Sequence, residues 1–197
     1  MLESNTKPKF RGPSMPITGE LYKQVGRASA GSVCIVAAYD RVTDAVVGLT
    51  ASSFVTLSFD PPMVMFALQQ HAESYASMVS SKAFGVSVLS RNQSKVASLF
   101  AKKGREKIEQ TTFAVGQVLH VPLISHSLAH VECLTSQILL SGDHAIVVGV
   151  VEAAQIFSGE PLMYFSGSYG SFAPIPAGSN NATATPEVVL RGNPVKT

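Results

Sequence analysis

The sequence is poor in charged residues, in cysteine and in long apolar runs. Asp, Glu, Lys and Arg make up 14% of its 197 residues, against about 25% in an average soluble domain. So few charges hardly cover the surface of a monomer, which favours an oligomer that buries part of it. The net charge of +2 comes without a basic block, so the sequence gives nucleic-acid binding little electrostatic support and predicts no such partner.

Apolar runs are too short to cross a membrane. The longest are Val33–Ala38 and Ala145–Val151, whereas a spanning helix needs roughly 18 or more residues. The N-terminal residues lack the apolar segment of a secretory signal. The two cysteines, Cys34 and Cys133, lie inside apolar runs, where free thiols are usually buried and reduced. These features predict a cytoplasmic protein without a membrane segment or disulfide framework.

Composition divides the chain into three parts. Residues 1–17 carry three prolines and no periodic pattern, which is typical of an arm. Residues 173–197 are rich in Pro, Gly, Ser, Asn and Thr, which predicts a flexible tail. The folded unit is therefore expected over residues 18–172, a length that suits one domain.

Strand signals dominate this central part. Seven segments rich in Val, Ile and Phe predict strands, at residues 32–38, 45–49, 54–58, 63–68, 84–89, 128–140 and 144–157. Only Ser141, Gly142 and Asp143 separate the last two, which indicates a hairpin. Gly149 in the last strand can mark a bulge or the close approach of another group.

Helices are expected to be few. They are predicted at residues 18–25, at residues 72–80, and from the capping-box spacing of Ser90 and Gln93 to an end near Gly104. Many strands, short helices and no alternation of strand and helix argue against a Rossmann sheet. The pattern favours a closed or split antiparallel barrel.

The most informative stretch is VGLTASSFVTLSFDPP at residues 47–62. Gly48 lets the chain turn, and Thr50, Ser52 and Ser53 then offer three hydroxyls and several backbone N–H groups within four residues. Such a loop can hold a phosphate without a formal charge. The same residues would also suit a polar turn between two strands, with solvated hydroxyls.

Other candidate residues are weaker by themselves. His144 at the hairpin mouth can hydrogen-bond a ligand or move a proton, or pair with a local carboxylate. The aromatic residues of 161–169 can stack on a planar ring, or fill the core from an edge strand. His120, His126 and His130 lack the convergence of metal ligands, so no metal site is predicted. The chain has no nucleophile elbow, Walker loop, GxGxxG after a strand or paired catalytic carboxylates.

Taken in order, five stretches resemble the short-chain flavin reductase family, the reductase component of two-component flavin-dependent monooxygenases. They are Gly48–Phe54, Ser58–Pro62, Phe84–Leu89, Gly142–His144, and Pro161–Tyr164 with Tyr169. The resemblance covers about residues 20–172. It implies a mainly β fold, a split β-barrel of the Greek-key, FMN-binding type with a few short helices, present as a homodimer.

The resemblance also implies an enzyme, an NAD(P)H:flavin oxidoreductase. Hydride would pass from NADH or NADPH to FMN or FAD, and the reduced flavin would supply a partner monooxygenase. The flavin carries the chemistry, so the protein needs no nucleophile or strong base. The resemblance leaves two alternatives open. One is a flavoprotein with tightly bound FMN that reduces another acceptor, such as ferric iron or a corrinoid. The other is a non-enzymatic flavin- or haem-binding module of the same fold.

The implied binding residues follow from matched positions. Residues 46–50 with Ser52 and Ser53 match the family segment that wraps the flavin ribityl chain and phosphate. Residues 67–74 match a second flavin-contacting stretch, and Ala101 and Lys102 match contacts at the phosphate end. His144 and Tyr169 match positions facing the nicotinamide, with His144 as a positioning group that needs no acid–base role. The implied set is Val47, Gly48, Leu49, Thr50, Ser52, Ser53, Leu68, Gln69, Ser74, Ala101, Lys102, His144 and Tyr169.

Overall fold

The computed structural model describes residues 17–104 and 106–175. Residues 29–174 form one compact unit, and residues 17–28 belong to a second unit. The arm expected at residues 1–17 and the tail expected at 173–197 fall almost entirely outside the described residues. Within the described ranges, no helix is both long and apolar enough to cross a membrane.

The second unit contains one helix, α1, at Gly19–Arg27. The helix begins after Thr18, whose hydroxyl oxygen accepts a hydrogen bond from the Leu21 N–H at 3.2 Å. A threonine in this position satisfies a backbone donor that the first helical turn leaves free. The helix predicted at residues 18–25 is therefore confirmed, with an end two residues later.

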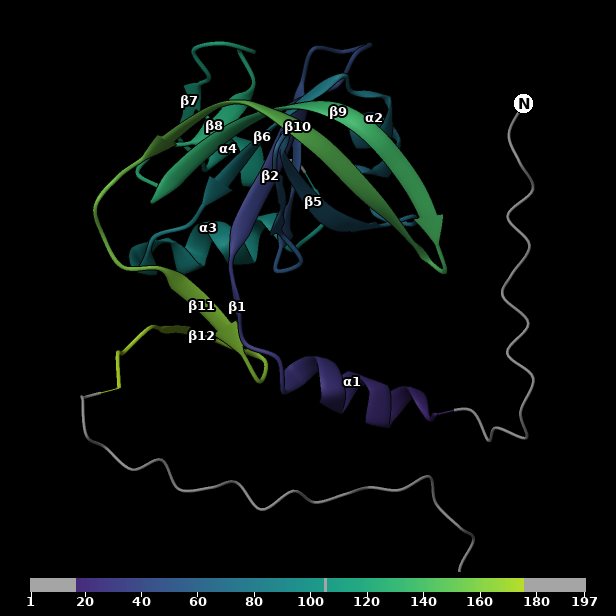
Figure 1. Cartoon of the computed structure of the whole chain (residues 1–197), viewed down its shortest axis with the longest axis vertical. Helices are drawn as coiled ribbons and strands as arrows, with labels where there is room; N and C mark the ends of the chain where they lie inside the picture. Colours follow the sequence, from purple (N-terminus) through teal and green to yellow (C-terminus); the bar gives the residue numbers. More distant parts are fainter. Residues whose placement is uncertain (1–16, 105, 176–197) are drawn as a thin grey trace, which may run out of the picture. The chain divides into compact units, whose positions relative to one another are not determined.

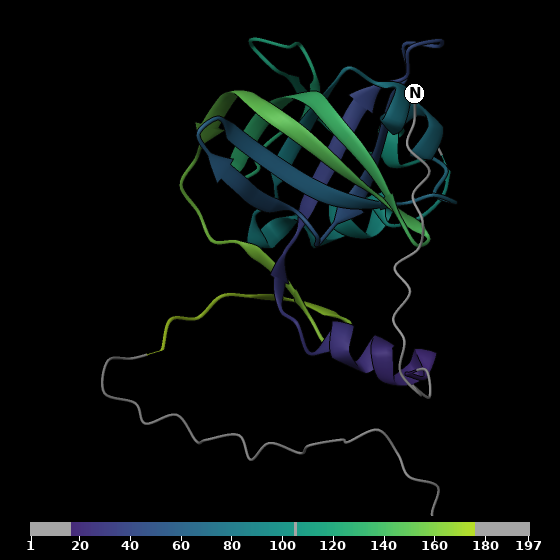
Figure 2. The ribbon, with the colours of Figure 1, turned by 45° about the vertical axis from the view of Figure 1, so that its right-hand side comes forward.

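Seven antiparallel strands form the main sheet of the first unit, in the order β3-β2-β6-β9-β10-β5-β4. Figure 1 labels β2, β6, β9, β10 and β5 of this sheet. Each of the seven strands corresponds to one of the seven predicted strands. Their bounds are β2 Cys34–Tyr39, β3 Val46–Ala51, β4 Val55–Phe59, β5 Pro62–Gln69, β6 Ala83–Val88, β9 Ala129–Ser141 and β10 His144–Ile156. The sheet is strongly curved (Figure 2).

The chain connection between the two edge strands explains the curvature. Only residues 52–54 separate β3 from β4, which are the opposite edges of the sheet. In a flat sheet of seven strands these edges would lie about 29 Å apart. The connection from Ala51 to Val55 spans at most about 14 Å. The sheet must therefore curl until its edges approach each other, although no ladder of hydrogen bonds joins them within the described residues.

Shorter elements complete this unit. A three-stranded sheet has the order β1-β11-β12, and β7 pairs with β8. The helical elements of this unit are α2, the 3₁₀ helix η1, α3 and α4. The bounds are β1 Gly31–Ser32, β7 Phe113–Val115, β8 Pro122–Ile124, β11 Leu162–Phe165, β12 Ser168–Ser171, α2 Tyr75–Ser80, η1 Arg91–Gln93, α3 Ser94–Phe100 and α4 Glu106–Glu109.

The predicted capping box at Ser90 is confirmed. The Ser90 N–H donates to Gln93 Oε1 at 2.9 Å, at the start of η1, and α3 follows directly. The expected helix end at Gly104 is wrong, because α3 ends at Phe100 and the Lys102 N–H bonds the Leu99 carbonyl at 3.1 Å. Gly104, with φ of +106°, instead shapes the connection that leads into α4.

Strand β2 is buried on both of its faces. Cys34, Val36 and Ala38 belong to one apolar cluster, together with residues of β5, β6 and β10. The run from Val33 to Ala37 also supplies alternate residues to a second cluster, which includes Phe100 of α3. Helix α3 therefore covers the face that would otherwise meet water. Because both faces of β2 are buried, its sequence is a continuous apolar run and does not alternate between apolar and polar residues.

The hairpin of β9 and β10 is confirmed, with its two-residue turn at Gly142 and Asp143. Gly142 has φ of +61°, a conformation that suits glycine. The interpretation of Gly149 is also confirmed. The ladder shifts between Val148 and Gly149, and a Cβ on Gly149 would lie 2.5 Å from Cζ of Phe84.

Candidate functional site

A cleft of about 600 Å³ opens beside β3, at an edge of the curled sheet. Four segments line it: β3 with the turn after it, the end of β5 with the connection to α2, the chain from the end of α3 to α4, and the first residue of β10. These segments are distant in sequence, and the curl of the sheet brings them together.

Eleven of the thirteen implied binding residues line this one cleft. They are Gly48, Leu49, Thr50, Ser52, Ser53, Leu68, Gln69, Ser74, Ala101, Lys102 and His144. The other two lie elsewhere. Val47 lines an adjoining cavity. Tyr169 lies on β12, where it packs against the second apolar cluster and its ring centroid is 5.4 Å from that of Tyr164.

The wall formed by β3 offers backbone hydrogen-bonding groups. Among the strands that the structure describes, β3 is an edge strand and pairs only with β2. In an antiparallel ladder alternate residues bond the partner strand, and the intervening residues direct their N–H and C=O groups to the other side. Because Gly48–Ser53 line the cleft, these unpaired groups border it. A polar planar ligand could bond them much as a neighbouring strand would.

The region expected to be a hydroxyl-lined loop differs from that expectation. Residues 46–51 form strand β3, and the chain bends only after Ala51. Gly48 lies within the strand and makes no turn. It allows close packing, because a Cβ there would lie 2.9 Å from the Val36 carbonyl oxygen and 3.0 Å from Cε1 of Phe100.

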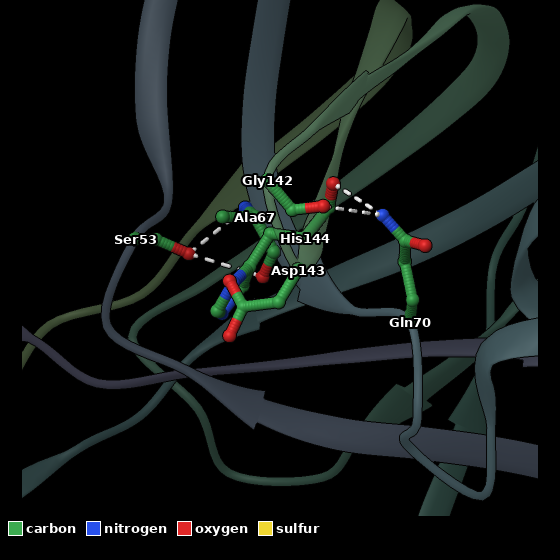
Figure 3. Close-up of polar contacts among 6 residues, drawn as sticks. All are labelled: Ser53, Ala67, Gln70, Gly142, Asp143 and His144. Atoms are coloured by element: carbon green, nitrogen blue, oxygen red, sulfur yellow. Dashed lines mark hydrogen bonds and ion pairs between the residues drawn. The ribbon is translucent and has the colours of Figure 1, made fainter.

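Two of the three hydroxyls expected to hold phosphate bond the protein itself. Thr50 Oγ1 donates to the Ala97 carbonyl at 2.7 Å, which ties β3 to α3. Ser53 Oγ accepts from the Ala67 N–H at 2.9 Å, which ties the turn after β3 to β5 (Figure 3). Ser52 is exposed. The hydroxyls at 50 and 53 therefore help to shape the cleft, and their contact with a phosphate stays a prediction.

The hairpin tip places His144 at the cleft. Gln70 holds this tip, since its side-chain amide donates to the carbonyls of Gly142 and His144, each at 3.1 Å (Figure 3). The Nδ1 of His144 lies 2.6 Å from Oδ1 of Asp143. The hydrogen bond with His144 lowers the pKa of the Asp143 carboxyl below its ordinary value of 3.8. Asp143 thereby fixes the imidazole, whose side chain is 37% exposed at the cleft.

Three lysines, Lys102, Lys103 and Lys107, gather where α3 leads into α4. We call them the lysine corner. Lys107 is nearly buried, with 10% of its side chain exposed. Its Nζ donates to the Lys102 carbonyl at 3.1 Å and lies 3.7 Å from Oε2 of Glu73. That carboxylate oxygen also accepts the Gly104 N–H at 2.9 Å.

The lysine corner can bind an anion. An ammonium group has three N–H donors, and the Lys102 carbonyl takes one at Nζ of Lys107. The Glu73 carboxylate, 3.7 Å away, compensates the charge of this nearly buried ammonium, and the remaining N–H donors can still bond an anionic ligand in the cleft. The sequence pointed to Lys102 but missed Lys103 and Lys107, because KKGREK reads as a solvated run of charges.

Two other buried polar residues have structural partners. The Glu132 carboxylate accepts hydrogen bonds from the N–H groups of Gln117, Val118 and Leu119, at 2.6 to 3.3 Å. His130 Nε2 bonds the Ile124 carbonyl at 2.7 Å. In the part of the chain that the structure describes, no group of three or more His, Cys, Asp or Glu residues could hold a metal ion.

Known proteins with similar sequences are reductases of flavin. The chain is 32% identical over 155 residues to the reductase component of the 4-nitrophenol 4-monooxygenase/4-nitrocatechol 2-monooxygenase of Rhodococcus opacus, over 79% of this chain and 81% of that protein. It is 30% identical over 151 residues to an NADH-dependent flavin reductase of a Rhodococcus species, over 77% of this chain and 84% of that protein.

A similar fold occurs in the NADH:FAD oxidoreductase of Streptomyces globisporus C-1027, solved in complex with NAD and FAD fragments. The TM-score is 0.73 at 27% identity, over 82% of this chain and 98% of that one. In addition, the family model described as the flavin reductase like domain matches residues 26–173. With this match over most of its length, the chain belongs to the flavin reductase family.

Proposed function

We propose that this protein is an NADH-dependent flavin reductase that supplies reduced flavin to a partner monooxygenase. One observation carries the proposal: residues implied for flavin binding from four distant segments line a single cleft of about 600 Å³ with a lysine corner. The relative from Rhodococcus opacus is itself named a monooxygenase reductase component.

The residues of the cleft fit a flavin nucleotide. The unpaired backbone groups of β3 can bond the polar edge of the ring system, and the lysine corner can bind its phosphate. When bound, the flavin supplies the ring that accepts a hydride from the nicotinamide. The protein's own task is to hold two planar rings together in a reactive orientation.

His144 and its partners would orient the nicotinamide. The imidazole is partly exposed at the cleft, Asp143 fixes its ring, and Gln70 holds the hairpin that carries it. No proton transfer by His144 is needed for this role. Tyr169 stays a prediction as a nicotinamide contact, since it does not line the cleft of its own subunit.

We also propose that the curled sheet is a split barrel that works as a homodimer. Edge strand β4 exposes Val55, Leu57 and Phe59, and the Phe59 side chain is 94% exposed. An exposed apolar edge strand favours association and is usually covered. A second copy of this chain would cover it. We expect sedimentation to show a dimer, and Phe59→Lys to shift the protein toward monomer.

A cytoplasmic location follows from the proposed chemistry. The reductant NADH is a cytoplasmic metabolite, and the two free buried thiols, Cys34 and Cys133, suit a reducing compartment.

Oxidation of NADH, followed at 340 nm with and without added flavin, tests the function. We expect oxidation that requires FMN or FAD and stops when flavin is omitted. Purified protein that oxidises no NADH at any flavin concentration would overturn the proposal. Dialysed protein that stays yellow would instead favour a resident flavin that reduces another acceptor.

A further inference from the structure

A second cavity of about 440 Å³ adjoins the cleft at the lysine corner. The two spaces share Gly48, Glu73, Ser74 and Lys107 in their walls. His144 and Ser53 border the cleft but not the second cavity. Because β3 is extended only from Val46 to Ala51 and the second cavity lies at the start of this strand, the second cavity continues the cleft beyond the lysine corner, away from His144.

The walls of the second cavity are aliphatic on one side. Val46 and Val47 at the start of β3 line it together with Ala45 just before the strand, and Ile108 lines it from α4. Aliphatic walls of this kind pack against planar heterocycles and remove them from water. Asp40 and Thr43 add polar groups at its border.

Asp40 keeps a free acceptor beside these walls. Its Oδ1 accepts the N–H groups of Val42 and Thr43 and the Thr43 hydroxyl, at 2.9 to 3.0 Å. Its Oδ2 accepts the Ser77 hydroxyl at 2.5 Å. Each carboxylate oxygen has two lone pairs, so Oδ2 can take one further donor. These hydrogen bonds, that of Ser77 foremost, hold the pKa of Asp40 well below its usual range.

A ligand that extends past the lysine corner would meet these groups in a fixed order. A phosphate group would lie at Lys107, a planar heterocycle would pack on Val46 and Ile108, and a hydroxyl donor would reach Asp40. FMN ends at its phosphate, whereas in FAD a second phosphate joins that group to adenosine. The adenosine supplies both the purine ring and the ribose hydroxyls.

We propose that the second cavity receives the adenosine half of FAD, and that the enzyme prefers FAD to FMN as its flavin. This inference rests on the proposed function. With FMN bound, the aliphatic walls and the free Asp40 acceptor would meet only water. Aliphatic area removed from water and an added hydrogen bond favour FAD.

Flavin titrations of the full chain, read by quenching of flavin fluorescence, test the preference. We expect FAD to bind at least tenfold more tightly than FMN. In Ala45→Phe, an added ring would fill the second cavity, so FAD affinity should fall to that of FMN while FMN affinity stays unchanged. Ala76→Phe, on the exposed side of α2 and in neither cavity wall, is the matched control and should keep the preference.

Asp40→Asn provides a second variant in case Ala45→Phe does not fold. It keeps an acceptor for the local N–H groups and should weaken FAD binding severalfold, with FMN unchanged. Equal affinity of the unmodified protein for FAD and FMN would overturn the inference. A preference for FAD that survives both substitutions in folded protein would also overturn it, by placing the adenosine elsewhere. Binding of neither flavin would instead reject the proposed function.

Discussion

The Ser53 hydroxyl oxygen accepts the backbone N–H of Ala67 at 2.9 Å, across the side of the sheet where the described strands form no ladder that would close the curl. This contact joins the turn after β3 to β5. It holds two walls of the cleft at a fixed separation. Ser53 is therefore a structural brace in this fold, and its predicted contact with the flavin stays a prediction.

Ser53→Ala should destabilise the protein. The substitution leaves the partly buried Ala67 N–H without its acceptor, which costs about 1–2 kcal/mol in the free energy of unfolding. Urea unfolding followed by circular dichroism measures the change. Ser52→Ala is the matched control, because Ser52 is exposed, and its unfolding should not change. If both variants were as stable as the unsubstituted protein, the hydrogen bond between Ser53 and Ala67 would not contribute to stability.

Lys107→Met should weaken flavin binding through the phosphate. The buried ammonium makes charge-assisted bonds worth about 1.5–3 kcal/mol, so the Kd for FMN or FAD should rise tenfold or more. Riboflavin has no phosphate, and its affinity should stay nearly constant. The exposed lysine variant Lys103→Met should have a smaller effect. If Lys107→Met weakened riboflavin and FMN equally, the phosphate would not lie at the lysine corner.

The two lysines show why part of the site escapes sequence reasoning. Lys107 belongs to a run of charged residues, and only the turn between α3 and α4 buries it against the Lys102 carbonyl. Nothing in residue order distinguishes it from its exposed neighbour Lys103. The strands were predictable because β-branched runs bounded by Gly, Pro and Ser are local signals. Burial of one lysine is a property of the assembled fold.

The roles of side chains in β3 could not be predicted from the sequence for a similar reason. The sequence shows that Thr50 carries a hydroxyl near a cleft-forming segment, but its acceptor is the carbonyl of Ala97, far along the chain. The sequence suggested that Gly48 lies in a turn, whereas the structure shows that a glycine is needed there because the Phe100 ring packs closely against it. The hairpin of β9 and β10 was easier to predict from the sequence, because its turn residues lie directly between the two strands that they connect. Short strands such as β7 and β8 carry too few residues for a pattern.

His144→Ala should impair use of NADH without loss of flavin binding. The KM for NADH should rise several-fold to tenfold, because the ring that orients the nicotinamide is lost, while the flavin Kd should not change. Asp143→Asn should have a milder effect of the same kind. Steady-state kinetics at saturating flavin separate the two constants. Unchanged NADH kinetics in His144→Ala would remove this residue from the site.

The same pair has a defined pH dependence. Its hydrogen bond lowers the pKa of Asp143 below 3.8 in the folded protein. The contact is therefore fully present above about pH 4, and it is lost as the pH falls through the lowered pKa. A loss of activity on acidification that begins above about pH 4 must come from other groups.

The two buried thiols should make the fold sensitive to alkali. Burial raises the pKa of Cys34 and of Cys133 from 9.0 to about 12. In the unfolded chain they would ionise near pH 9, so the unfolded state gains stability as the pH rises from about 9 to 12. The contribution of the two thiols to the free energy of unfolding should be constant below pH 9 and fall above it. Urea midpoints at pH 8 and 10.5 measure the fall, which should be smaller in Cys133→Ala.

Thiol reagents test the burial behind that pH dependence. Both cysteines should be inert to a disulfide reagent in the native protein and react once urea unfolds it, because neither side chain is accessible. Rapid modification of either thiol in folded protein would contradict the burial. An equal alkaline fall in Cys133→Ala would assign the loss of stability to other groups.

Placement of the flavin is tested most directly by a crystal structure of the protein soaked with FAD. We expect flavin density in the cleft, with the ring against the backbone edge of β3 and a phosphate within hydrogen-bond distance of Nζ of Lys107. Density at another surface, with this cleft filled by side chains of the protein, would contradict the assignment of the site.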